Sequence, residues 1–278
     1  MNRLPAMLVT MTTTCTYEDV VDLRRYPISE PGRAEYRTLV QSCRDQLRDH
    51  GVAQLDGFLT PAAVSEMIAE SGRLADHAWV SNQSHTVYFR PPDDSAGPDH
   101  PRALMQHSAK KAIAYDLIPA GAPMRRLYES DDMTAFIAAV LGKPVLYRSA
   151  DPFDALQIAV FEDGDELGWH FDNSEFSVTV MYSESEAGGH FDYYPRLRDE
   201  RDENYPGVRK VLLGDPGGVV RLPSSPGTLA VFRGQHALHR VTPVRGPQPR
   251  INSVLTYGEN PGMKLNELTQ QLFYGRTK

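Results

Sequence analysis

The sequence has little cysteine, no long apolar run and no excess of positive charge. Its 278 residues include only two cysteines, Cys15 and Cys43. They show no disulfide pattern, so we expect a reducing compartment, the cytoplasm. No apolar stretch approaches the roughly 20 residues that cross a bilayer. The net charge of −7 disfavours an anionic nucleic acid as partner. We therefore expect neither a membrane nor a nucleic acid among its partners.

The first 30 residues carry little that predicts structure. Met1 to Thr10 contains one arginine and a short apolar stretch, which makes it a poor signal peptide. We predict a loose leader over residues 1–30, with Met7 and Met11 as alternative starts. Residues 31–278 are long enough for a single domain with a sizeable core.

The part of the chain from 31 to about 150 is predicted to be mainly helical. Apolar residues recur at helical spacing over 35–49, and Gly51 follows at the expected C-cap before a short strand. Thr60 and Pro61 form a good helix start, with threonine as N-cap and proline in the first turn, for a helix over residues 61–78. Further helices are expected at 122–129 and 131–141. Residues 84–122 carry no clear pattern.

The part from about 151 to 278 is predicted to be a small antiparallel barrel. It contains short segments rich in Val, Thr, Phe and Tyr, which Gly or Pro separates. These segments are 155–161, 176–182, 190–194, 219–222, 228–232, 237–242 and 251–257. No helical pattern of ten residues lies between them, which disfavours a parallel sheet. The predicted fold class is α+β, mainly β: a double-stranded β-helix, or cupin-like jelly roll, with bracing N-terminal helices.

Two histidines and one carboxylate in the barrel half have the spacing of a metal site. The motif GWHFD places His170 and Asp172 two residues apart, so in an extended chain both point to the same side. His239 follows in ALHRVTPV and supplies a third ligand from a distant strand. This is the ligand set of non-haem Fe(II) oxygenases, whose open face takes a cosubstrate and dioxygen.

The other histidines are weaker candidates. His236 lies three residues before His239, and on one strand the two point to opposite sides, so only one can be the ligand. We predict His239, because the chain after it continues as a strand while His236 falls at the preceding turn. His190 is interpreted as an ordinary strand residue. Among the scattered histidines, only His85, in SHTVYFR, is a candidate pocket residue.

An arginine downstream is expected to bind the cosubstrate. Arg250 follows His239 by eleven residues, in PQPRINSVLTY. A guanidinium pairs bidentately with a carboxylate and keeps its charge, which suits the distal carboxylate of 2-oxoglutarate. We interpret 237–257 as a hairpin with a Pro-Gly turn, which would bring Arg250 alongside His239. The alternative is a strand-end arginine in solvent, with Arg240 or Arg245 in the cosubstrate role.

Several longer stretches carry a family resemblance. They are DGFLTP (56–61), GDELGWHFDNSEFSVTV (164–180), EAGGHFDYYPRLR (186–198), DENYPGV (202–208), PGTLAVFRGQHALHRVTPVRG (226–246) and PRINSVLTY (249–257). On these, the chain resembles the 2-oxoglutarate/Fe(II) oxygenase family that contains the free-amino-acid radical halogenases and their hydroxylase relatives. The resemblance covers most of residues 50–275. It implies Fe(II), 2-oxoglutarate and O2 as cofactors, and a free amino acid of specialised metabolism, lysine-like or otherwise polar, as substrate.

One position separates the two chemistries of this family. The halogenases carry a small residue where Asp172 stands, which vacates a coordination site for chloride. Because the carboxylate is present here, the resemblance implies a hydroxylase that attacks an unactivated C–H bond.

The resemblance also implies substrate contacts. It matches Asn173 and Thr256 to positions that touch the amino acid, and Phe273-Tyr274 to a closing aromatic pair. Lysine-specific members have a tryptophan-rich pair there, and they are polar where Val254 stands. Both departures put lysine itself in doubt.

Two other functions fit the same ligands. A protein side-chain hydroxylase of the prolyl hydroxylase type would need an open groove, and the C-terminal aromatic closure argues against one. A non-catalytic, cupin-like metal-binding module would have no use for a buried Arg250 beside its ion. The charged segment 196–203 is interpreted as a solvated loop, with a substrate lid as the alternative. The expected partner is a small molecule, and a homodimer is compatible with the sequence.

Overall fold

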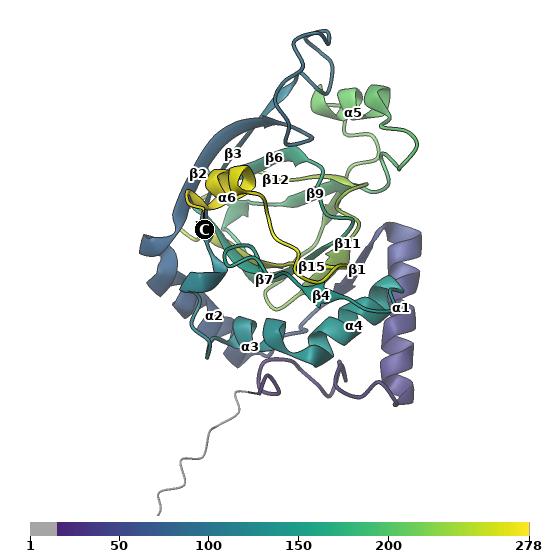
Figure 1. The fold of residues 1–278 in the computed structure, drawn as a ribbon, viewed down its shortest axis with the longest axis vertical. Helices are drawn as coiled ribbons and strands as arrows, with labels where there is room; N and C mark the ends of the chain where they lie inside the picture. The colour runs from purple at the N-terminus through teal and green to yellow at the C-terminus, as the bar shows by residue number, and fades with distance from the viewer. Residues whose placement is uncertain (1–15, 278) are drawn as a thin grey trace, which may run out of the picture.

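A curled antiparallel sheet forms the centre of the computed structural model, which describes residues 16–277 (Figure 1). Its strands, in order across the sheet, are β1 (Val52–Leu55), β11 (Leu229–Phe232), β7 (Ser177–Ser183), β14 (Arg250–Leu255), β5 (Leu156–Phe161), β3 (Met105–Ile113), β6 (Glu166–His170), β12 (Leu238–Val241), β9 (Phe191–Tyr194) and β10 (Val220–Leu222). The strand β2 (Trp79–Thr86) pairs with β3 outside this order. All of these pairs are antiparallel, as the strand-rich composition predicts.

The long strand β3 joins the two halves of the sheet. Its residues 111–113 pair with β5, whereas residues 108–109 pair with β6. The sheet therefore folds over at β3, and the half that contains β7 and β14 faces the half that contains β6 and β12. This double layer confirms the predicted jelly roll. Two short pairs lie beside it, β13 (Val244–Arg245) with β8 (Ala187–Gly188) and β15 (Tyr257–Gly258) with β4 (Tyr147–Arg148).

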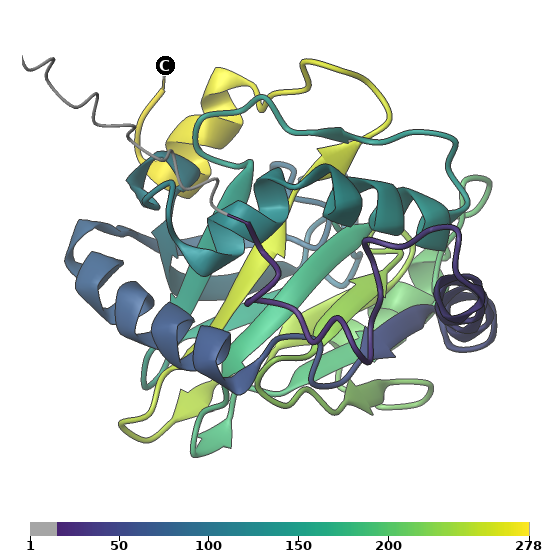
Figure 2. The same ribbon diagram turned by 90° about the horizontal axis from the view of Figure 1, so that it is seen from below.

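Helices cover the outer face of one half of the sheet. They are α1 (Ala34–His50), α2 (Pro61–Leu74), α3 (Pro123–Glu129) and α4 (Asp131–Leu141), and Figures 1 and 2 show them on the same side. All six residues of β5 are buried, because one face packs against the main core under these helices and the other faces the barrel interior. The bracing helices predicted from the sequence are confirmed.

The helix ends follow their capping residues. Gly51 takes the left-handed conformation at the end of α1, with φ 78°. The Thr60 side chain accepts a hydrogen bond from the Ala63 N–H at the start of α2, as expected for an N-cap. The predicted helix after Pro61 is too long, because α2 ends at Leu74 and a 3-10 turn, η1 (Ala75–His77), follows. A second 3-10 turn is η2 (Tyr115–Leu117).

Residues 16–30 are packed rather than loose. Val20, Tyr26 and Ile28 are buried in the main core, and the Tyr26 hydroxyl donates a 2.6 Å hydrogen bond to the Asp56 carbonyl. The predicted leader over 1–30 is therefore too long. Its remaining part, with the alternative starts Met7 and Met11, lies outside the described residues.

The predicted hairpin over 237–257 is wrong. Strand β12 pairs with β6 and β9, whereas β14 pairs with β5 and β7. The segment between them crosses from one half of the jelly roll to the other instead of turning back. A local Pro-Gly signal is the same for a hairpin and a crossover, so only the long-range pairing decides between them.

Two helices in the second half of the chain were not predicted from the sequence. The helix α5 (Tyr205–Leu212) comes directly after the charged segment 196–203, and α6 (Glu267–Tyr274) lies over the barrel beside β2 (Figure 1). Residues 84–122, which the sequence left unassigned, contain all of β3. No helix in the described part of the chain is long and apolar enough to span a membrane.

Candidate active site

Three potential metal ligands converge inside the barrel. His170 ends β6 and lies opposite His239 of β12 in the antiparallel register, and Asp172 follows two residues after His170. The carboxylate is 3.5 Å from Nε2 of each histidine, through Oδ1 to His170 and through Oδ2 to His239. Their ligand atoms all lie within 4.8 Å of one another. No other group of this kind converges within residues 16–277.

Hydrogen bonds to the backbone orient both imidazoles. Nδ1 of His170 donates to the Gly168 carbonyl, and Nδ1 of His239 donates to the Ala237 carbonyl, each over 2.8 Å. Each bond fixes the tautomer and leaves the Nε2 lone pair directed at the carboxylate. This is the support that metal-binding histidines usually have.

The protonation states also suit a metal ion. Burial and the neighbouring His239 lower the pKa of His170 to about 4, so its imidazole is neutral at physiological pH. Burial opposes ionisation of Asp172, but the two histidines outweigh it and hold the pKa of the carboxyl well below its usual range. Neutral imidazoles and an ionised carboxylate are the ligating forms. The three side chains therefore fit a divalent metal ion.

A buried cation lies in the same cavity. Arg250 begins β14, is 5% exposed and lines the inner cavity together with the three ligands. Its Nη1 donates to Asn252, but its Nε finds no hydrogen-bond partner among residues 16–277. Burial lowers the pKa of Arg250 to about 10, so the guanidinium stays charged at neutral pH. A buried donor without a partner fits a ligand that carries a carboxylate.

Two charged residues that the sequence did not single out line the inner cavity. Lys110 of β3 donates a 2.8 Å hydrogen bond to Gln157 of β5. Asp154, just before β5, accepts hydrogen bonds from the Tyr274 hydroxyl at 2.8 Å and the Thr256 hydroxyl at 3.3 Å. Burial raises the pKa of Asp154 to about 6 and lowers that of Lys110 to about 8. A charged residue within or next to a buried strand is the sequence feature that could have identified both residues as candidates.

The residues expected to touch substrate are distributed around this cavity. Asn173, Thr256 and Phe273 line it. Tyr274 does not, but its hydroxyl bonds to Asp154. His85 is buried behind the lining, and its ring nitrogens are engaged by the Thr86 carbonyl and the Ser108 hydroxyl. Neither nitrogen of His85 is left for a substrate.

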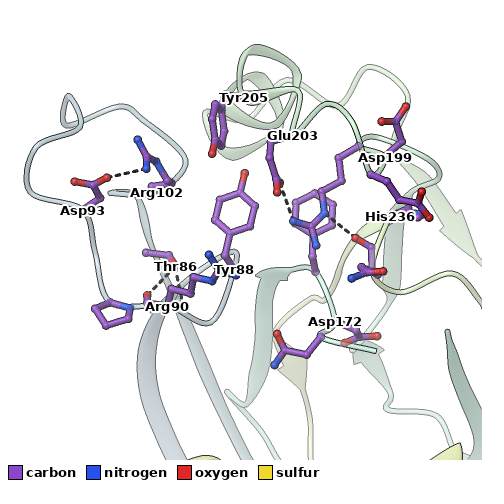
Figure 3. A pocket seen from close by; sticks show the side chains of 16 residues that line it. Thr86, Tyr88, Arg90, Asp93, Arg102, Asp172, Asp199, Glu203, Tyr205 and His236 are labelled. Atoms are coloured by element: carbon purple, nitrogen blue, oxygen red, sulfur yellow. Dashed lines mark hydrogen bonds and ion pairs between the residues drawn. The ribbon is translucent and has the colours of Figure 1, made fainter. Parts of the chain in front are cut away.

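A second cavity, here called the outer cleft, opens on the other side of Asp172. It has a volume of about 710 Å³ and lies between the connection from β2 to β3 and the segment before α5 (Figure 3). Arg198 lines the outer cleft: it donates to the Gln235 carbonyl and to Glu203, and its guanidinium lies 4.0 Å from the Phe171 ring centroid. The segment 196–203, predicted to be a solvated loop, therefore forms one wall of this cleft. Asp172 and Asn173 line both cavities.

Comparisons with known proteins agree with this geometry. The family model described as Halogenase D matches residues 36–272. No curated protein matches the sequence.

Several solved structures share the fold. The non-haem alpha ketoglutarate dependent epimerase SnoN from nogalamycin biosynthesis is 16% identical with a TM-score of 0.54, covering 80% of this chain and 81% of that chain. AviO1 from Streptomyces viridochromogenes is 18% identical with a TM-score of 0.53, covering 80% and 95%. A Trichoplax adhaerens prolyl hydroxylase, in complex with a hypoxia inducible factor peptide fragment, is 14% identical with a TM-score of 0.51, covering 81% and 94%.

Proposed function

The chain belongs to the Halogenase D family and has the fold and ligand set of a 2-oxoglutarate-dependent Fe(II) oxygenase, and from that premise we propose that it hydroxylates an unactivated C–H bond of a small substrate. The carboxylate of Asp172, held between His170 and His239, is the observation that carries this proposal. A halogenase needs that coordination position for its halide. In this chain the Asp172 carboxylate would occupy it.

The metal would be held by His170, Asp172 and His239. Fe(II) bound there would supply the oxidising chemistry, with O2 and 2-oxoglutarate as co-reactants. The protein's part is to keep the His170 imidazole neutral, to direct the Nε2 atoms of both histidines inward and to shield the site from solvent. The two histidine side chains are each 4% exposed, which meets the last condition.

Arg250 would bind the distal carboxylate of 2-oxoglutarate. Its guanidinium is fixed by Asn252 on one side, while Nε has no hydrogen-bond partner in the described part of the chain. A bidentate carboxylate would satisfy this donor and offset the cost of burying the charge. Such a donor argues against a non-catalytic metal-binding module, because a metal ion alone would leave it unsatisfied.

We assign a free amino acid as the substrate class. The inner cavity has a volume of about 240 Å³, which is below the range of about 300–1,000 Å³ that holds drug-sized ligands. It presents a cation and an anion, Lys110 and Asp154, which suit the carboxylate and the ammonium of a zwitterion. Asn173 and Thr256 add polar contacts. Phe273 closes the cavity by packing edge-on against Phe89, with ring centroids 5.8 Å apart.

A protein side-chain hydroxylase is the second candidate. The outer cleft favours it, because a cavity of about 710 Å³ beside Asp172 has room for a longer chain. The cover of α6 and Phe273 over the inner cavity favours the free amino acid.

The proposal includes a cytoplasmic location, consistent with the buried free thiol of Cys43.

A product screen tests both candidates. The protein, loaded with Fe(II) and 2-oxoglutarate in air and in the presence of chloride, is incubated with single amino acids and with short peptides. We expect a polar amino acid to gain the mass of one oxygen, with equimolar succinate. Turnover of peptides alone would favour the second candidate. A chlorinated product from the unaltered protein would contradict the hydroxylase assignment.

A further inference from the structure

The carboxylate of Asp172 is less enclosed than the two histidines. Its side chain is 25% exposed, against 4% for each of His170 and His239. Asp172 lies just beyond the end of β6 and lines the inner cavity, and it also lines the outer cleft that Figure 3 shows. Packing alone therefore does not hold this side chain on the metal side. The outer cleft beside Asp172 offers space for another orientation of the carboxylate.

Two contacts hold Asp172 in place. The hydroxyl of Ser177, the first residue of β7, donates a hydrogen bond to Oδ2. The backbone N–H of Asp172 donates to the carbonyl of Gly234 over 3.1 Å. One contact orients the carboxylate, and the other anchors its backbone to the turn between β11 and β12.

Gly234 also sets how closely that turn approaches. A Cβ atom at position 234 would overlap both Oδ2 of Asp172 and Oγ of Ser177. Gly234 is not in the left-handed conformation, so its backbone does not require glycine. Glycine is required instead by the close approach of this turn to the Asp172 carboxylate. Any larger residue would have to push the carboxylate or the serine aside.

We propose that Ser177 and Gly234 are positioning residues that keep the Asp172 carboxylate on the metal and thereby exclude an exogenous anion from its coordination position. The inference rests on the proposed function. The choice between hydroxylation and halide binding then depends on the residues that hold the acid as well as on the acid itself. Ser177 contacts Asp172 through its hydroxyl and Gly234 through its backbone carbonyl, so we expect both to act through Asp172.

The test uses Co(II), an air-stable probe for the Fe(II) position, on the full-length protein. Ser177→Ala removes the hydroxyl without adding bulk, and Gly234→Ala adds the overlapping methyl group. Ser183→Ala lies on the same strand, with its hydroxyl bonded to the Glu184 carbonyl. It is the control for Ser177→Ala. Gly121→Ala, where a Cβ meets nothing within 4 Å, is the control for Gly234→Ala.

We expect Ser177→Ala to bind Co(II) about 10- to 100-fold more weakly, the usual effect of losing a partner of a metal ligand. Both site variants should show a chloride-dependent change in the Co(II) absorption spectrum that the wild type and the controls lack. Thermal unfolding of the metal-free proteins tests for misfolding. If Gly234→Ala does not fold, Ser177→Ala decides the question.

Two results would overturn the inference in different ways. Wild-type Co(II) affinity and no chloride response in Ser177→Ala would remove the positioning role and leave the proposed function intact. A wild-type protein that binds no Co(II) would remove the proposed function, and the inference with it.

Discussion

The hydroxyl of Tyr274 donates a 2.8 Å hydrogen bond to the carboxylate of Asp154 and accepts one of the same length from the amide of Gln157. Tyr274 ends α6, whereas Asp154 and Gln157 belong to the wall of the inner cavity. The helix that covers the cavity is thus hydrogen-bonded to a carboxyl group that lines it. Under the proposed function, closure of the site and recognition of a charged substrate would involve the same hydrogen bonds.

Loss of this hydroxyl should weaken substrate binding. Tyr274→Phe leaves Asp154 with one fewer donor, and a hydrogen bond to a charged group is worth enough to raise KM about tenfold. Steady-state kinetics on the amino acid identified by the product screen measure it, and kcat should change less than KM. Tyr147→Phe, at an exposed tyrosine outside the cavity, is the control. An unchanged KM would show that the Tyr274 hydroxyl on α6 does not contribute to substrate binding.

Metal binding should depend on His239 and not on the nearby His236. His239→Ala removes one of three ligands, so stoichiometric Fe(II) binding should disappear while the circular dichroism spectrum persists. His236→Ala is the matched control, because His236 lines the outer cleft and lies outside the convergent group. Loss of iron binding in the control, with retention in His239→Ala, would reverse the ligand assignment.

The requirement for 2-oxoglutarate should depend on Arg250. Lysine keeps the charge but loses the planar fork, so the carboxylate would be buried with an incomplete partner. We expect Arg250→Lys to raise the cosubstrate KM by roughly two orders of magnitude. Arg245→Lys, outside the cavity, should retain the wild-type value. An unchanged requirement in Arg250→Lys would exclude it as the cosubstrate anchor.

Asp172 should determine the kind of product. Asp172→Gly opens the coordination position and should lose hydroxylation. In the presence of chloride it should form at most a trace of chlorinated product, because the rest of the site is built around the carboxylate. Mass spectrometry distinguishes the two products. Retained hydroxylation in this variant would show that the acid is not needed as a ligand.

The pH dependence of kcat/KM should reflect the charged pair in the cavity. Burial raises the pKa of Asp154 to about 6, so below this pH the carboxyl is protonated and loses its attraction for an ammonium. Burial lowers the pKa of Lys110 to about 8, so above this pH the amine is neutral and loses its attraction for a carboxylate. Because kcat/KM reports the free enzyme, it should be highest between these values and fall on both sides. Asp154→Asn should remove the acidic limb, and an unchanged acidic limb would contradict the assignment.

The same pKa shifts predict how stability varies with pH. The folded state holds the Asp154 proton to a higher pH than the unfolded chain, so unfolding free energy should fall as pH rises from about 4 to about 6. The folded state releases the Lys110 proton earlier, so stability should recover above about pH 8. Urea titrations of the wild type and Asp154→Asn between about pH 4 and pH 10 measure this dependence. The variant should lack the decrease in unfolding free energy between about pH 4 and pH 6.

Local sequence patterns were enough to predict the jelly-roll fold, the N-terminal helices and the metal-binding motif of the site. Strand alternation and Gly or Pro punctuation predicted the jelly roll, and capping residues such as Thr60 and Gly51 predicted helix ends within a residue. The spacing of His170 and Asp172 placed both on one face, because side chains two apart in extended chain point the same way. These features depend on neighbours in the chain, which the sequence displays directly.

Only the tertiary structure decided which distant residues meet. Arg250 reaches the cavity from the half of the sheet opposite His239, and not through a hairpin, because strand pairing is set by burial over the whole barrel rather than by the turn. Lys110 and Asp154 come together through the pairing of β3 with β5, and Gly234 meets Asp172 through the turn between β11 and β12. No local sequence pattern encodes these contacts. Each joins segments that are far apart along the chain, and the distance between them in sequence does not determine how their strands pair.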